Sequence, residues 1–150
     1  MNLEKPNTNR PAASAVPLNS TMHMAWVRHI AGRLKSDYRY SAKLVYNNYP
    51  WPQDVTEKQR GAVEDAAQQV LDVRERYPDS SLADLYDPLS MPADLTKAHA
   101  KLDRAVDCAY CSQPFPNERN RIEYLFKSYQ QLTAPLLPAK TVRKRRTPQR

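Results

Sequence analysis

Apolar side chains recur at intervals of three and four residues in four stretches of the chain, the spacing of one buried face on an α-helix. The first stretch follows Ser20 and Thr21, two good helix N-caps, and predicts an amphipathic helix that ends near Gly32 to Leu34. The apolar positions of this helix are Met24, Val27, Ile30 or Ala31, and Leu34, with Trp26 widening the stripe.

The second stretch begins with a capping box. Thr56 and Gln59 have the T-x-x-Q spacing in which each side chain bonds the backbone of the other, and the helix continues until Pro78. Its apolar positions are Val63, Ala66 or Ala67, Val70, Val73 and Tyr77. A short turn of helix is predicted after it, around residues 81–86.

The third and fourth stretches predict two more helices. Ser90 is the expected cap of a helix with a proline in its first turn that runs to about Tyr110. Asn117 is the expected cap of a last helix, which Pro135 stops. The apolar positions are Leu95, Ala98, Leu102, Ala105 or Val106, and Ala109 in the third helix, and Ile122, Leu125, Phe126, Tyr129 and Leu132 in the fourth. The three later stripes can bury one another as a small bundle, so the predicted fold class is mainly α.

The pattern changes between the first helix and this bundle. Residues 37–46 are rich in aromatic and β-branched side chains without a helical period, and predict an extended, strand-like segment. Residues 47–52 contain two prolines and predict a loop. Residues 1–19 hold three prolines and no apolar period, and residues 138–150 are basic with almost no apolar side chains. Both ends are therefore expected to be disordered.

Charge is distributed unevenly along the chain. The net charge is +7, and residues 1–52, 53–139 and 140–150 contribute +5, −4 and +6. A basic front and a basic tail around an acidic body predict that the ends face an anionic partner such as nucleic acid. The tail by itself is expected to bind polyanions without sequence specificity.

Composition excludes several classes of protein. The two glycines, Gly32 and Gly61, are far apart, which excludes a glycine-rich phosphate or cofactor loop. No apolar run approaches the length of a membrane span, and the first residues lack the pattern of a secretory signal. The two cysteines are too few for a disulfide framework. These features predict a soluble, cytoplasmic protein without a membrane partner.

The pair Cys108-x-x-Cys111 admits two interpretations. It could form half of a zinc site or a redox dithiol, but only His23, His29 and His99 offer further nitrogen ligands. We therefore expect two ordinary reduced thiols and no bound metal. His29 is expected to be a surface or packing residue of its helix, and the acids of residues 53–139 a solvated face.

Basic and aromatic side chains alternate from Arg28 to Lys43. This stretch has a net charge of +4 and interleaved tyrosines, a mixture suited to phosphate contacts and base stacking, with burial of the aromatic rings as the equal alternative. In an extended segment Lys35 and Asp37 would point to the same face. Lysine can donate to guanine and a carboxylate can accept from cytosine, so the pair matches one G·C base pair, the alternative being an exposed ion pair.

Several segments resemble the end of the target-recognition region and the helical C-terminal segment of MmeI-like type II restriction-modification DNA adenine methyltransferases. They are 22–28 (MHMAWVR), 32–41 (GRLKSDYRYS), 45–52 (VYNNYPWP), 81–92 (SLADLYDPLSMP), 102–107 (LDRAVD) and 123–126 (EYLF). The resemblance covers residues 20–137 and implies that the family's pair of charged residues reading one base pair falls on Lys35 and Asp37. Within these bounds it implies a remnant of the recognition region (20–52) and a helical C-terminal domain (53–137). Residues 1–19 and 138–150 do not resemble the family, and are the disordered leader and the basic disordered tail expected from composition.

The family's catalytic motifs are absent from these 150 residues. The resemblance implies S-adenosylmethionine as the family's cofactor, bound by a glycine-containing loop, and an adenine held by an (Asn/Asp)-Pro-Pro-(Tyr/Phe) motif. The chain has neither element, nor a nuclease motif of the P-D…(D/E)-x-K kind. We therefore expect no cofactor in this chain and no activity when it is alone.

Two hypotheses follow. In the first, the chain is the DNA-recognition and C-terminal portion of a site-specific adenine methyltransferase, with double-stranded DNA and a methyltransferase or nuclease chain as partners. The residues expected to contact DNA are Arg28, Arg33, Lys35, Asp37, Arg39, Tyr40 and Lys43. In the second, the helices form a protein-interaction or scaffold module that docks through exposed Trp26, Tyr49 and Trp51, and the tail is incidental.

Overall fold

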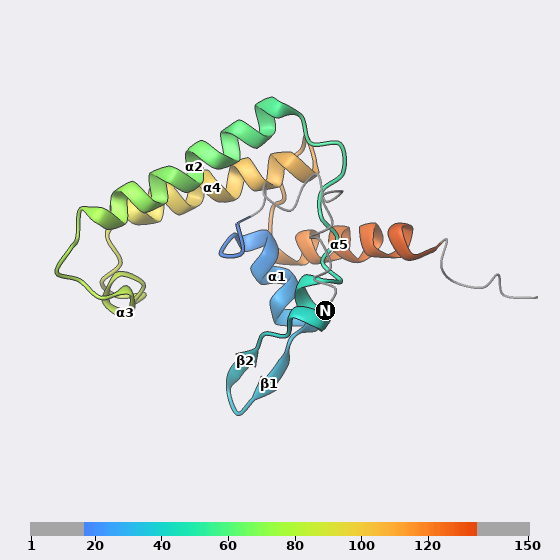
Figure 1. The fold of residues 1–150 in the computed structure, drawn as a ribbon, viewed down its shortest axis with the longest axis horizontal. Coiled ribbons are helices and arrows are strands. Elements are labelled where there is room, and N and C mark those ends of the chain that lie inside the picture. Colours follow the sequence, from blue (N-terminus) through green and yellow to red (C-terminus); the bar gives the residue numbers. More distant parts are fainter. Residues whose placement is uncertain (1–16, 135–150) are drawn as a thin grey trace, which may run out of the picture.

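A computed structural model describes residues 17–134, and this part of the chain is mainly helical, as predicted (Figure 1). The elements in chain order are α1 (Thr21–Ile30), β1 (Gly32–Leu34), β2 (Asp37–Arg39), η1 (Ala42–Tyr46), α2 (Glu57–Glu75), α3 (Leu82–Leu85), α4 (Ala93–Tyr110) and α5 (Glu118–Thr133). The predictions for residues 1–16 and 138–150, and for Pro135 as a helix stop, lie outside the described residues.

Helices α2 and α4 lie side by side and antiparallel, joined through the short α3 (Figure 1). The predicted capping box starts α2: the amide of Gln59 donates to the Thr56 hydroxyl over 3.3 Å, and the Thr56 amide donates to the Gln59 side chain over 3.0 Å. The predicted stripes of the two helices face each other, and the buried positions are Val63, Ala66, Val70 and Val73 in α2 and Leu95, Ala98, Leu102, Val106 and Ala109 in α4. Burial of these side chains from water is the main stabilising contribution of the pair.

Helix α1 joins this pair to α5, because it contacts both α4 and α5. Trp26 of α1 is 1% exposed, and its indole N–H donates to the carbonyl of Val45 over 3.1 Å. Its ring lies 5.6 Å from Phe126 and 5.8 Å from Tyr129 of α5, measured between ring centroids. The stripe of α5 shares one buried cluster with those of α2 and α4, as predicted, but most of the helix contacts of α5 are with α1.

One hydrophobic core includes residues from both sides of the loop at 47–56. Met22, Trp26 and Val45 precede this loop and Tyr49 lies within it, and all four belong to the same buried cluster as the residues of α2, α4 and α5. The loop prediction for 47–52 is confirmed, and the chain enters α2 only at Glu57. The segment of residues 20–52 is thus anchored in the helical body.

The structure corrects three predicted boundaries. Helix α1 ends at Ile30, because Ala31 adopts an extended conformation and Gly32 starts β1; Leu34, predicted on the helical stripe, is 67% exposed. Only residues 37–39 of the predicted extended segment form a strand, and residues 42–46 form η1, a π-helical turn. The cap of α4 is Pro92, while the Ser90 hydroxyl donates to the carbonyl of Asp84 over 3.2 Å.

No helix within residues 17–134 combines the length and the apolar character that crossing a membrane requires.

Candidate nucleic-acid interface

A small β-hairpin projects from the helical body at the end of α1 (Figure 1). Strands β1 and β2 pair antiparallel, with Gly32 opposite Arg39, Arg33 opposite Tyr38, and Leu34 opposite Asp37. All six residues are exposed. A two-residue turn, Lys35 and Ser36, connects the strands, and Lys35 adopts a left-handed φ of 58°. The hairpin therefore presents its side chains and its turn to solvent.

The strand register divides the hairpin into two faces. Residues directly opposite each other share a face, so Arg33 and Tyr38 lie on one side, and Leu34, Asp37 and Arg39 lie on the other. The Arg33 guanidinium lies 4.7 Å from the centroid of the Tyr38 ring and donates to the Tyr38 hydroxyl over 3.1 Å. Arg33 is thus held against a tyrosine, and its charge remains accessible.

Lys35 lies in the turn of the hairpin, and Asp37 starts β2. The prediction that an extended backbone points both side chains to the same face is therefore wrong. Among residues 17–134, Lys35, Asp37, Arg39 and Lys43 form no ion pair, so the exposed-pair alternative for Lys35 and Asp37 is not observed. Their charges are available to a partner.

Tyr40 follows β2 and is 44% exposed, which rules out its burial as a core residue. Its hydroxyl lies 3.2 Å from Nε2 of His23, a residue of α1 that is 1% exposed. The His23 ring also packs edge-on against Tyr49, with centroids 4.6 Å apart. Burial lowers the pKa of His23 from 6.5 to about 4, so its imidazole is neutral at pH 7.

The sequence prediction did not identify His23 as a site residue. The available signal was its position, three residues before Trp26 and four before Val27, which places it on the buried face of α1. His29, in contrast, is exposed, and its Nδ1 lies 2.8 Å from the carbonyl of Ala25, in agreement with its predicted surface position.

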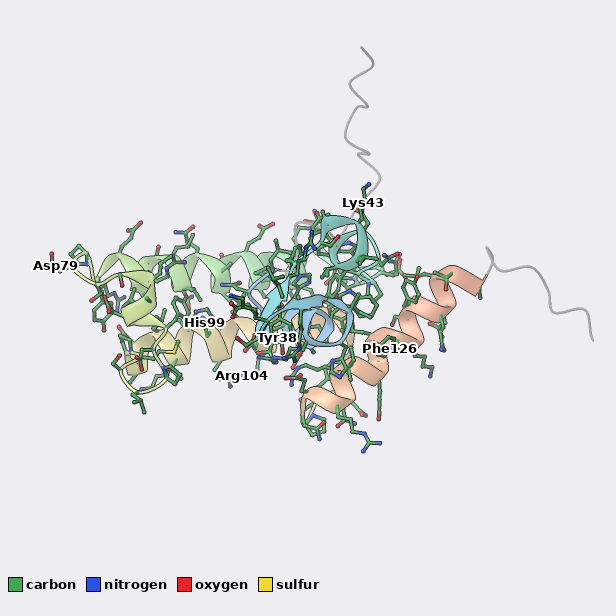
Figure 2. All side chains as sticks on the ribbon, turned by 90° about the horizontal axis from the view of Figure 1, so that it is seen from below. Tyr38, Lys43, Asp79, His99, Arg104 and Phe126 are labelled. Carbon is green, nitrogen blue, oxygen red and sulfur yellow. The ribbon has the colours of Figure 1, made fainter. Side chains whose placement is uncertain are left out.

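Arg28 and Lys43, the first and last of the predicted DNA-contacting residues, differ in their surroundings. Lys43 lies on η1 and points away from the body (Figure 2). Arg28, on the last turn of α1, forms an ion pair with Glu118 at the start of α5. The structure thus brings the seven predicted residues to the end of α1, the hairpin and η1, with Arg28 already engaged.

Two acidic residues of α4 form hydrogen bonds with the neighbouring helices α1 and α5. Asp103 accepts hydrogen bonds from the backbone N–H and the hydroxyl of Thr21 over 2.8 and 2.5 Å, which anchors the start of α1. Asp107 is 5% exposed and accepts two hydrogen bonds from Arg121 over 3.1 and 2.6 Å. The interpretation of the acids as a solvated face is wrong for Asp107, since this carboxylate joins α4 to α5.

The docking surface of the second hypothesis is not present. Trp26 and Tyr49 are 1% and 3% exposed, and Trp51 is half-buried against Tyr49, with ring centroids 4.8 Å apart. These aromatic side chains stabilise the fold and do not form an exposed apolar surface.

Cys108 is exposed, Cys111 is partly exposed, and both are free thiols. The Cys108 carbonyl accepts a hydrogen bond from Gln59 over 2.8 Å, so its backbone helps to join α4 to α2. Within residues 17–134, no group of three or more His, Cys, Asp and Glu side chains is arranged to hold a metal ion.

Two family models and two known proteins match most of the chain. The family model described as the MmeI target recognition domain matches residues 9–53, and that of the MmeI C-terminal domain matches residues 55–137. DNA methyltransferase A of Bacillus subtilis (strain 168) is 46% identical over 116 residues, which cover 77% of this chain and 13% of that protein.

A solved structure of the type IIL restriction-modification enzyme MmeI in complex with DNA is also similar. It shares 53% sequence identity with this chain and superimposes with a TM-score of 0.74, over 78% of this chain and 16% of that one. The chain thus spans less than a fifth of the length of either relative.

Proposed function

The chain belongs to the MmeI family, with sequence from the family's target recognition and C-terminal domains, and from this premise we propose that its β1–β2 hairpin contacts double-stranded DNA. The protein would serve as the recognition portion of a site-specific DNA adenine methyltransferase. One observation carries the proposal: an exposed hairpin projects from the body with cations that have no acidic partner among the described residues.

The shape and charge of the hairpin suit a DNA duplex. The major groove admits a two-stranded β-ribbon, and the stretch from Arg28 to Lys43 has a net charge of +4. Arg33, Arg39 and Lys43 are the candidates for phosphate contacts, because such contacts position a protein on DNA without reading its sequence. Arg28 can join them by exchanging its ion pair with Glu118 for a phosphate.

Lys35 and Asp37 are the candidates for reading a base pair. Lys35 lies at the tip of the hairpin and Asp37 starts the returning strand, so both reach the end that would enter the groove first. A lysine can donate to O6 and N7 of guanine while a carboxylate accepts from N4 of the paired cytosine. Base reading by this pair requires only that both side chains lie at the tip of the hairpin. It does not require them to share a face of a strand.

The remaining residues have a supporting role in this proposal. Residues 20–52 would carry recognition and residues 53–137 would hold the recognition segment in place, since the two share one core. Methyl transfer needs a pocket for the extracted adenine and a site for S-adenosylmethionine, and these 150 residues contain neither motif. A chain that contains both would be the catalytic partner.

Exchange of the two charges tests the proposal. In the full chain, the double variant K35D/D37K should keep its fold, because aspartate tolerates a positive φ and lysine is acceptable in an exposed strand. Selection from a randomised duplex pool should show the preference at one base pair reversed from G·C to C·G. Each such contact discriminates by about 1–3 kcal/mol, or about 5- to 150-fold.

A variant of the tail provides the control. Alanine at Arg143, Lys144, Arg145 and Arg146 should lower the affinity equally for all sequences and flatten its salt dependence. If the full chain shows no salt-sensitive binding to duplex DNA in fluorescence anisotropy, the proposal is wrong. If binding occurs but K35D/D37K selects the same sequences as the wild type, base reading by this pair is refuted.

A further inference from the structure

The contact between His23 and Tyr40 joins a buried group to an exposed one at the base of the hairpin. His23 is 1% exposed and Tyr40 is 44% exposed, with 3.2 Å between Nε2 and the hydroxyl oxygen. The other ring nitrogen of His23, Nδ1, is buried and has no hydrogen-bond partner in the described part of the chain. A neutral imidazole carries one proton, on Nδ1 or on Nε2. Its position therefore decides whether the Tyr40 hydroxyl accepts a hydrogen bond from His23 or donates one to it.

The unpartnered nitrogen favours one tautomer. With the proton on Nδ1, a buried N–H would lack an acceptor, and buried N–H groups without a partner are rare in folded proteins. With the proton on Nε2, that N–H donates to the Tyr40 oxygen, and only a lone pair on Nδ1 is unsatisfied. The second tautomer leaves the Tyr40 O–H free to donate outward.

A DNA phosphate needs such a donor. Phosphate oxygens carry no proton at neutral pH and only accept hydrogen bonds, and tyrosine hydroxyls are among the groups that contact them. Tyr40 lies two residues beyond Tyr38, next to the cations of the hairpin. We propose that His23 is a positioning residue: its Nε2–H donates to the Tyr40 oxygen, so that the Tyr40 O–H donates to a backbone phosphate of DNA bound at the hairpin. This inference rests on the proposed function.

Ring packing keeps the pair in place. The His23 ring contacts Tyr49 edge-on, and Tyr49 contacts the rings of Trp26 and Trp51 at centroid distances of 6.0 and 4.8 Å. Tyr49 is itself 3% exposed. His23 therefore has little freedom to turn away from Tyr40.

Three variants of the full chain test this inference by fluorescence anisotropy with a mixed-sequence duplex. Tyr40→Phe removes the O–H and should weaken binding about tenfold, while the slope of affinity against salt stays unchanged because no charge is lost. His23→Leu removes the N–H and should weaken binding by a similar factor. His23→Gln places an amide N–H near the position of Nε2 and should keep the affinity within about twofold, as expected where the hydrogen bond is retained.

The double variant H23L/Y40F separates positioning from a general effect on the fold. It should bind as weakly as Y40F alone, because both changes remove the same contact. Tyr86 and His99 provide a matched control, since the Tyr86 hydroxyl and Nε2 of His99 lie 2.7 Å apart where Tyr86 ends α3, an element that lies away from the hairpin (Figure 1). Tyr86→Phe should leave DNA affinity unchanged.

The possible results distinguish failure of this inference from failure of the proposed function. Absence of salt-sensitive DNA binding by the wild type refutes both. If Arg39→Ala weakens binding but Y40F does not, the hairpin still contacts DNA and the phosphate contact of Tyr40 is refuted. If H23L and Y40F weaken binding independently, or if H23Q binds as weakly as H23L, positioning by His23 is overturned. Should H23L fail to fold, Y40F and H23Q still decide the question.

Discussion

Acidification from pH 7 to pH 5 should destabilise the fold through His23. The folded state holds this imidazole buried and neutral, with its pKa lowered from 6.5 to about 4 by burial. Between these values the unfolded chain binds a proton that the folded chain does not, so acid favours unfolding. The stability that depends on neutral His23 is complete above pH 6.5 and is lost as the pH falls toward 4.

The size of the effect follows from the separation of the two pKa values. At pH 5 the unfolded His23 is almost fully protonated and the folded one almost fully neutral, and each unit of pKa difference corresponds to about 1.4 kcal/mol. The loss between pH 7 and pH 5 is then about 2 kcal/mol, and the loss on reaching pH 3 is about 3 kcal/mol. Such a loss is a large part of the stability of a small domain.

Urea unfolding at several pH values, followed by tryptophan fluorescence, measures this effect. His23→Gln removes the titrating group, so its free energy of unfolding should fall less on acidification than that of the wild type, by about 2 kcal/mol at pH 5. The pKa of His99 is also lowered, mainly by burial, and contributes with the same sign in both proteins. Parallel pH profiles for wild type and H23Q would refute the reasoning.

Three further substitutions test the supports of the fold by urea unfolding. Arg121→Ala leaves the buried carboxylate of Asp107 without its partner and should cost about 3–5 kcal/mol; if adding Asp107→Asn does not recover part of this, the charge is not the cause. Thr56→Ala removes half of the capping box and should cost about 1 kcal/mol, whereas a similar loss in Thr56→Ser would argue against the cap. Trp26→Phe leaves the Val45 carbonyl without its indole donor and should cost about 1–3 kcal/mol, and an unchanged stability would contradict that role.

Helices with local start signals were predictable from sequence. Ser20, the Thr56 and Gln59 capping box, and Asn117 each cap the helix expected of them, because the relevant bonds join residues only a few positions apart. The hairpin was missed for a physical reason. Strands of three residues are too short to show a period, and Leu34 lies four positions after Ile30, which imitates the helical stripe.

The packing of the helices was less predictable. A stripe shows that a helix buries one face, but it does not identify the partner of that face. The stripe of α5 contacts α1, which lies about a hundred residues earlier in the chain, and Trp26 provides much of that contact. Contacts between such distant segments leave no local signal.

The candidate site was predictable as a group of residues but not as a geometry. The run of cations and tyrosines is visible in the sequence, and the structure places it on an exposed projection. The turn at Lys35 and the ion pair between Arg28 and Glu118 depend on strand pairing and on the packing of α5. The burial of His23 depends on Tyr49 and on the helical body in the same way.

The exposure of β1 and β2 has a consequence for how such proteins diverge. A substitution there removes little apolar surface from the core, so most side-chain changes at 33, 34 and 37–39 should be nearly neutral for stability. An insertion of one residue would instead shift the pairing and exchange the two faces of the hairpin. Descendants of one ancestor could therefore acquire different hairpin surfaces by point mutation alone, while the length of the hairpin and the helices beneath it stay the same.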